Sequence, residues 1–331
     1  MSKRFAYSYK FVLRSWLLAV AVLISANAFS QQLPYYTQFR PNAIALNPAL
    51  VGTKRILDVR FNYRKQWIGF VAAPITQELC LNGKFLKGKM GVGLIMFKDV
   101  TGPTKRNFYE LAYAFHIKYP DIQLSLGVAG NMIKYTVDGS LITTHYSQDP
   151  AIDLVSTIFD KSYDASAGLM LFNDRFHFGF SVLNMLSSKL NFFPESDSIK
   201  ENALAMVPHT YVTTGYKWQG TPYIIWENSL QVNYIPGVPI QMEYCLRIYF
   251  KEKMFIGASI RRHDAISLQT GITFLKDYHI AYSYDIGTSP LKQYHANTHE
   301  FMLVYSTNLE SLLGRYGTNK EFARQKFGYM F

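Results

Sequence analysis

The segment Gly83–Met90, with the sequence GKFLKGKM, comes closest in this chain to a nucleotide-binding motif. In a phosphate-binding loop, glycines and a lysine at this spacing surround the phosphates, and a Ser or Thr hydroxyl after the lysine binds magnesium. Met90 stands in that last position and no helix is predicted after it, so a basic hairpin turn is the better interpretation. Gly91 and Gly93 lack the third glycine of a dinucleotide fingerprint. We therefore expect no cofactor.

The run Arg261, Arg262, His263 and Asp264 places a possible base beside an acid, as a catalytic dyad would. Its position at a tight connection between two predicted strands favours a turn with local charge pairing instead. None of the eight histidines lies in a helical His-x-x-x-His metal pair, and no Gly-x-Ser-x-Gly nucleophile motif occurs. The sequence thus predicts a protein that is not an enzyme, with no catalytic residues, no metal site and no small-molecule substrate.

Other ionisable residues follow a regular spacing, because they alternate with apolar neighbours. The most regular of them are Arg60, Glu78, Glu110, Asp164, Glu243, Arg247 and Arg261. If their strands close into a barrel, these side chains share its lumen, where opposite charges pair. Charges of mixed sign make a poor filter for one kind of ion, so we interpret them as a lumen charge network that supports the wall.

The elements that carry these residues are β-strands. Side-chain character alternates at nearly every position in stretches such as 57–64, 109–119 and 266–274, and this period of two gives a strand one apolar and one polar face. The fourteen predicted strands begin at or near residues 57, 75, 90, 109, 122, 162, 175, 209, 224, 239, 254, 266, 278 and 298. Between them, residues 134–159 and 184–207 are expected to be long polar loops.

Three features indicate that the apolar faces meet lipid. Most predicted strands have the length of about 9 to 11 residues that a tilted strand needs to cross a bilayer. The apolar face of residues 109–119 begins and ends in Tyr, which suits two membrane interfaces. Short turns alternate with longer connections, the latter after strands one, three, five, seven and thirteen. We predict an all-β fold, a transmembrane antiparallel β-barrel of about 14 strands of the outer-membrane type. A soluble sandwich or propeller is the disfavoured alternative.

The chain divides into four parts. Residues 1–30 have a basic start, an apolar middle and a small-residue cleavage region, which predicts a signal peptide, export and a place in the bacterial outer membrane. Residues 31–54 contain Pro34, Pro41 and Pro48 and are expected to form an extended N-terminal leader. The predicted barrel occupies residues 55–306, and a basic, aromatic tail occupies residues 307–331.

Composition narrows the possible partners. Removing the four basic residues of the signal peptide lowers the formal charge from +11 to +7, and no Lys/Arg block is interleaved with aromatic residues, so no nucleic-acid partner is expected. Outer-membrane lipid is expected instead. The two cysteines, Cys80 and Cys245, lie on the polar faces of distant strands and are predicted to be free, buried thiols.

Short segments across the mature chain resemble a known family. These are Asn47-Pro48-Ala49 with Gly52; Tyr63–Gly69 with Ala73–Thr76; Tyr163-Asp164 with Gly168; Phe178–Ser181 with Asn184; Arg261 with Asp264-Ala265; Tyr282–Asp285 with Gly287, Ser289 and Leu291; and His299-Glu300. In this order they resemble the PorP/SprF family of type IX secretion system membrane proteins. The tail is a departure, because the family pattern ends close to the last strand.

The resemblance implies a non-catalytic outer-membrane barrel that works with the type IX secretion and gliding machinery. Such a protein would assist secretion or surface attachment of cargo proteins such as adhesins. The candidate partner-binding residues are Arg64, Gln66, Trp67, Asp285, His299 and Glu300. Trp67 is the best anchor for a partner, although packing at the barrel rim is an equal alternative. The alternative functions are a passive outer-membrane porin or small-solute channel and a soluble secreted binding protein.

Overall fold

The computed structural model describes residues 33–53, 57–142, 157–190, 192, 204–251, 253–275, 277–289, 292 and 297–307. The predicted signal peptide and residues 308–331 of the predicted tail lie outside this part of the chain. In the described residues, no helix has both the length and the apolar character needed to cross a membrane.

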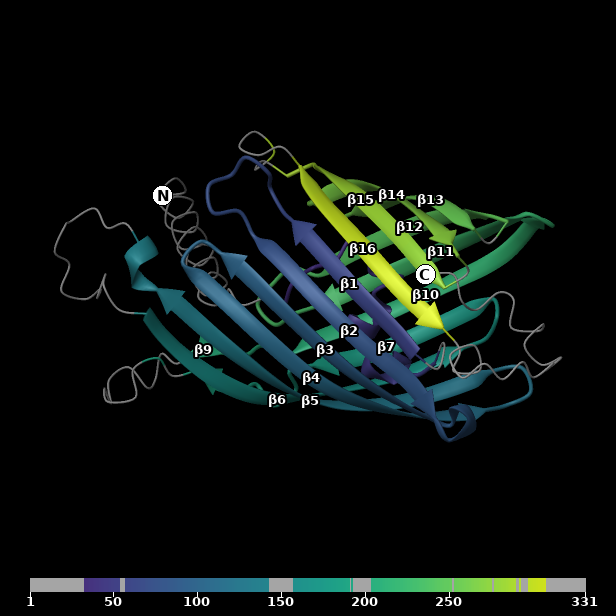
Figure 1. The fold of residues 1–331 in the computed structure, drawn as a ribbon, viewed down its shortest axis with the longest axis horizontal. Helices are drawn as coiled ribbons and strands as arrows, with labels where there is room; N and C mark the ends of the chain where they lie inside the picture. Colours follow the sequence, from purple (N-terminus) through teal and green to yellow (C-terminus); the bar gives the residue numbers. More distant parts are fainter. Residues whose placement is uncertain are drawn as a thin grey trace, which may run out of the picture.

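Fourteen strands pair antiparallel in a closed barrel, in which β1 joins β16 and completes the ring (Figure 1). Its strands are β1 (Leu57–Lys65), β2 (Ile75–Phe85), β3 (Met90–Thr101), β4 (Thr104–Lys118), β5 (Gln123–Asp138), β6 (Thr157–Phe172), β7 (Phe176–Leu183), β10 (His209–Thr221), β11 (Ile224–Tyr234), β12 (Gln241–Phe250), β13 (Met254–Arg261), β14 (Ala265–Phe274), β15 (Tyr278–Gly287) and β16 (Thr298–Thr307). A small separate sheet pairs β8 (Lys189–Leu190) with β9 (Leu204–Ala205).

Side chains alternate between the two surfaces of the barrel wall. In β14, Leu268 is 54% exposed on the outside and Ser267 is 0% exposed on the inside. Exposed apolar residues continue along the outer face of β15 and β16, including Tyr282 and Phe301. The predicted fold, a transmembrane barrel with apolar residues outside and polar residues inside, is confirmed.

The two ends of the barrel differ. At one end, here called the turn end, the strands are joined by two to four residues. The hairpin between β2 and β3 lies there and contains the short 3-10 helix η3 (Leu86–Gly88), so the prediction of a turn at Gly83–Met90 is confirmed. The opposite end, here called the loop end, carries the longer connections, such as residues 66–74 and 184–208.

Two expectations about the loop end are wrong. β5 and β6 extend to Asp138 and Thr157, into the expected loop 134–159, and only Gly102-Pro103 joins β3 to β4, where a longer connection is expected. Both errors have one cause. Strand ends that project beyond the lipid need no apolar outer face, so alternation fades there although hydrogen-bonded pairing continues.

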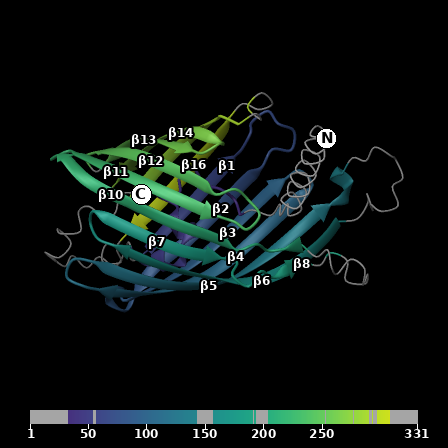
Figure 2. The ribbon, with the colours of Figure 1, turned by 180° about the vertical axis from the view of Figure 1, so that it is seen from behind.

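Inside the barrel lies the N-terminal segment, defined here as residues 33–53 (purple in Figure 2). Two short 3-10 helices, η1 (Ala43–Leu46) and η2 (Pro48–Leu50), interrupt the extended path expected from its prolines. Pro48 fits the start of η2, because it has no N–H to lose, and the Asn47 side chain caps that helix by accepting from Ala49 N at 2.9 Å. This segment fills much of the lumen.

Candidate functional site

The N-terminal segment crosses the lumen from one end to the other. Leu33 lies at the loop end, where its N–H donates to His209 Nε2 at 3.1 Å. Gly52 lies toward the turn end, where its N–H donates to Asn82 Oδ1 at 3.2 Å. Between these points, Asn47 Nδ2 donates to the Leu169 carbonyl at 3.0 Å. The segment is therefore bound to the wall along its whole length.

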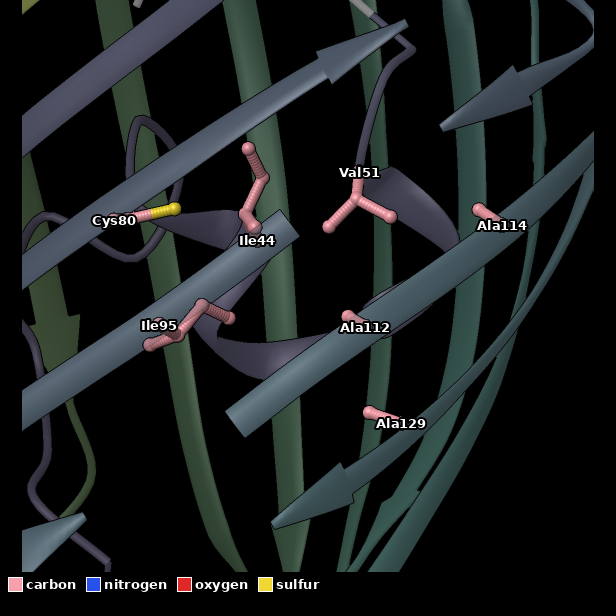
Figure 3. Packing of buried hydrophobic residues seen from close by; sticks show 7 residues of the cluster. All are labelled: Ile44, Val51, Cys80, Ile95, Ala112, Ala114 and Ala129. Atoms are coloured by element: carbon pink, nitrogen blue, oxygen red, sulfur yellow. The ribbon is translucent and has the colours of Figure 1, made fainter. Parts of the chain in front are cut away.

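The apolar part of this contact lies against β2 to β5. Figure 3 shows the two aliphatic side chains of the segment beside the five wall residues that they meet, and the members of the cluster are Ile44, Val51, Cys80, Ile95, Ala112, Ala114 and Ala129. Small wall residues let the backbone of the segment approach closely. Cys80 is free and buried here, and Cys245 is free and buried beneath Phe39 and Leu46, so the prediction for the two thiols is confirmed.

The polar part of the contact centres on Thr37. Its backbone N–H donates to Glu300 Oε2 at 2.8 Å, and its hydroxyl donates to Asp285 Oδ2 at 2.6 Å. Arg64 donates to the Thr37 hydroxyl at 2.7 Å, to Glu300 at 2.8 Å and to Asp285 at 3.0 Å. We call these four residues the Thr37 cluster. Three wall residues from β1, β15 and β16 thus hold one residue of the segment through buried, charge-assisted bonds.

Tyr35 makes a second polar contact nearby. Its hydroxyl donates to Glu243 Oε2 at 3.0 Å, and its ring lies 4.0 Å beneath the guanidinium of Arg261. Burial, followed by the negative charge of Glu243, raises the pKa of the Tyr35 hydroxyl well above its ordinary value. The hydroxyl therefore stays protonated and keeps donating to the carboxylate.

The seven predicted members of the lumen charge network are all buried. Two of them form an ion pair on adjacent strands: Arg261 binds Glu243 at 3.0 Å, and it also binds Asp264 at 2.6 Å within the predicted turn. Arg60 pairs with Asp58 at 2.5 Å on its own strand. Arg247 donates from its Nε to the side-chain amide oxygen of Gln269 at 3.1 Å.

The other three acidic members form no ion pair within the described residues. Asp164 accepts from the backbone N–H groups of Leu186 and Ser188, and Glu110 accepts from Ser166 at 3.3 Å. Glu78 lies buried in the wall beside Tyr36 of the N-terminal segment. The network is therefore a set of local pairs and hydrogen bonds, several of which include the N-terminal segment.

Two residues of the N-terminal segment complete this set, and neither was predicted from the sequence. Arg40 binds Glu227 at 2.8 Å, and Thr37 binds the other three members of the Thr37 cluster. One signal was available, because small residues such as Gly91, Ala112 and Gly127 recur on lumen-facing positions of neighbouring strands, which indicates that another chain segment packs there.

At the loop end, above the segment, lies a chamber of about 860 Å³. Leu33, Pro34 and Tyr35 line it together with residues from most of the surrounding connections. Gln66 and Trp67 line its rim, and Trp67 has its ring edge against Phe70 with the centroids 6.4 Å apart.

The six partner-binding candidates separate into three groups. Gln66 and Trp67 line the chamber, whereas Arg64, Asp285 and Glu300 are buried in the Thr37 cluster and bind the chain's own N-terminal segment. His299 lies on the outer face, where its ring nitrogen Nδ1 is 2.6 Å from the Tyr282 hydroxyl. In the described residues, no three His, Cys, Asp or Glu side chains are grouped as metal ligands.

Structural comparison finds similar solved proteins at low sequence identity. Omp33 of Acinetobacter baumannii is 8% identical, with 77% of this chain and 100% of that chain covered and a TM-score of 0.44. The toluene transporter TbuX of Ralstonia pickettii is 9% identical, with 80% and 92% covered and a TM-score of 0.45. A FadL homologue of Pseudomonas aeruginosa is 11% identical, with 84% and 96% covered and a TM-score of 0.44.

Sequence comparison is more specific. No curated protein sequence matches the chain. The sequence profile of the family described as type IX secretion system membrane protein PorP/SprF matches residues 28–305.

Proposed function

This chain belongs to the PorP/SprF family of type IX secretion system membrane proteins, and we propose that it is a non-catalytic binding component of that machinery. In this role it stands in the outer membrane and holds a secreted cargo protein, such as an adhesin, during export or at the cell surface. Its other partners are outer-membrane lipid and further components of the secretion and gliding machinery.

The observation that carries the proposal is the occupied lumen. A passive channel needs a continuous water-filled path, whereas this barrel holds residues 33–53 through apolar packing and through the buried bonds of the Thr37 cluster. Residues that would line a pore are therefore used to hold the protein's own chain. This favours a protein that binds partners at its surface over a protein that conducts solutes through its lumen.

The loop end supplies a suitable surface. The connection between β1 and β2 presents Phe70 and Val71 to solvent, and its first residues form the rim of the chamber. Trp67 is partly buried between these features. An aromatic residue at the edge of a cavity is the kind of side chain that dominates binding energy in protein interfaces.

The test is the substitution Trp67→Ala. If Trp67 is an anchor, its truncation costs about 2 kcal/mol or more of cargo binding, which is roughly a thirtyfold loss of affinity. Surface cargo should fall when it is measured by antibody labelling of intact cells, while the amount of folded barrel in the outer membrane stays constant.

The matched control is Leu141→Ala, which truncates an exposed apolar residue after β5 without touching the chamber rim. Cargo should be retained in that variant. An unchanged amount of surface cargo in Trp67→Ala would show that Trp67 is not an anchor for the cargo.

The porin alternative has its own signature. A passive channel gives large, steady currents when the purified protein is inserted in a planar bilayer. We expect no such currents from the intact chain, because the N-terminal segment occupies the lumen. Steady open currents would favour the channel over the secretion role.

A further inference from the structure

Within the described residues, part of the β6 edge of the β5–β6 hairpin has no paired strand. β6 pairs with β5 over its full length, from Thr157 to Phe172, but it pairs with β7 only from Ala167 to Phe172. Residues 184–190 contact β6 near Asp164. From Thr157 to Ser162, no described strand pairs with this edge, which lies at the loop end of the barrel (Figure 1).

The free groups on this edge can be identified from the alternation of the antiparallel ladder. The carbonyl of Ala165 points away from β5, because it accepts from Met185 N at 2.8 Å. Residues four and six positions earlier point the same way, because the register is unbroken. The N–H and C=O groups of Phe159 and Lys161 therefore face outward from the hairpin, and such an edge is a template for one more strand.

The side chains beside this edge favour a particular partner. Phe159 is 56% exposed and Tyr163 is 65% exposed, on the same face. Lys161 lies directly opposite Lys134 of β5, and Lys134 Nζ also lies 4.2 Å from the centre of the Phe159 ring. Two lysines in one cross-strand pair repel each other, and an acidic side chain on an added strand would relieve that repulsion.

We propose that Thr157–Ser162 of β6 is a strand-addition site for an extended acidic segment of a secreted partner. The segment adds its backbone to Phe159 and Lys161, places apolar side chains against Phe159 and Tyr163, and places a carboxylate beside the two lysines. This inference rests on the proposed role in holding a secreted protein. The β6 edge would give that partner a second contact, in addition to the chamber at the loop end of the barrel.

A second copy of this chain does not fit the edge. Antiparallel pairing of two identical β6 edges needs a two-fold axis normal to the barrel wall, and that axis lies in the plane of the membrane. One of the two barrels would then be inverted. A strand from another protein has no such restriction.

The test uses the purified full chain in lipid nanodiscs and a labelled synthetic peptide of about ten residues, the length of a strand in such a barrel. The peptide alternates Val and Thr, with one central Glu. Binding is measured by fluorescence anisotropy. The barrel variant Lys161→Pro removes only an outward N–H and keeps the β5 ladder, so it should weaken peptide binding about tenfold. Lys161→Ala should weaken it less, because the N–H remains.

A matched pair of peptides tests the backbone contact directly. N-methylation of alternate amides blocks pairing when the methyl groups face β6 and leaves it intact when they face away, so only one of the two methylated peptides should bind. If both methylated peptides bind equally, or if only the lysine charge matters, the edge binds anions such as lipid headgroups and the proposal is overturned. No binding of the parent peptide also overturns it, whereas the chamber role is tested separately by Trp67→Ala.

Discussion

The N-terminal segment passes so close to β5 that Gly127 has no room for a side chain. A Cβ atom at this position would lie 2.5 Å from Ala49 Cα, and it would lie nearer still to the backbone atoms Ala49 N and Pro48 C. Gly130, three residues further along the same strand, has nothing within 4 Å of its added Cβ. We therefore predict that Gly127→Ala displaces the segment from the wall, and that Gly130→Ala does not.

The size of the effect follows from this geometry. Backbone atoms must retreat by about 1 Å to restore an ordinary contact, and overpacking of this kind costs about 1 to 3 kcal/mol. Since the rest of the barrel wall is unchanged, this cost falls on the docked state of the segment. The equilibrium between the docked and displaced states then shifts by roughly 5-fold to 150-fold.

Cys80 provides the assay. Its side chain is 0% exposed beneath Ile44 and Val51, so it reacts with a maleimide only when the segment leaves (Figure 3). With Cys245→Ala removing the second thiol, the labelling rate of Cys80 reports the displaced population. The rate should rise by roughly 5-fold to 150-fold in Gly127→Ala.

The control variant Gly130→Ala should label at the parent rate. Heat-modifiable mobility on gels checks that each barrel is folded. A folded Gly127→Ala barrel that labels no faster than its parent would refute the close packing described here, as would equal acceleration in Gly130→Ala.

Two substitutions test the interior and the exterior of the wall. Arg64→Met leaves two buried carboxylates without the guanidinium that binds them, so the free energy of unfolding should fall by about 3 to 5 kcal/mol. Urea titration measures this change, and Lys65→Met, the control at the next residue, should change the free energy of unfolding little. Equal midpoints for the two variants would argue against the Thr37 cluster. Leu268→Arg places a charge on the lipid face in the middle of β14 and should lower the free energy of unfolding by about 2 to 4 kcal/mol. Leu275→Arg, in the turn that follows, should lower it by about 1 kcal/mol or less. Equal losses in the two variants would contradict the membrane position of β14.

The architecture could be predicted because its signal is local. Each strand must present apolar residues to lipid and polar residues to the lumen. The types of neighbouring residues, such as Ser267 and Leu268, therefore indicate which of them faces the lumen and which faces lipid. The strand ends could not be predicted as well. Lys134 to Asp138 continue β5 through pairing with β4 and β6, beyond the region where lipid imposes a pattern.

The candidate site was only partly predictable. Gln66 and Trp67 follow a predicted strand and are predicted to bind a partner, and the structure places both at the chamber. Arg64, Asp285 and Glu300 lie in short segments that resemble the family, and nothing in those segments indicates that the three side chains face the lumen together and bind Thr37.

By itself, the sequence determined the number of strands, their faces and the family, because period-two alternation and short motifs are properties of neighbouring residues. The tertiary structure decided what fills the barrel. Thr37 meets Glu300 across 263 positions of the chain, and Arg64 joins that contact because β1 pairs with β16. Closing the sheet brings Arg64 and Glu300 together, and their burial strengthens the charged hydrogen bonds.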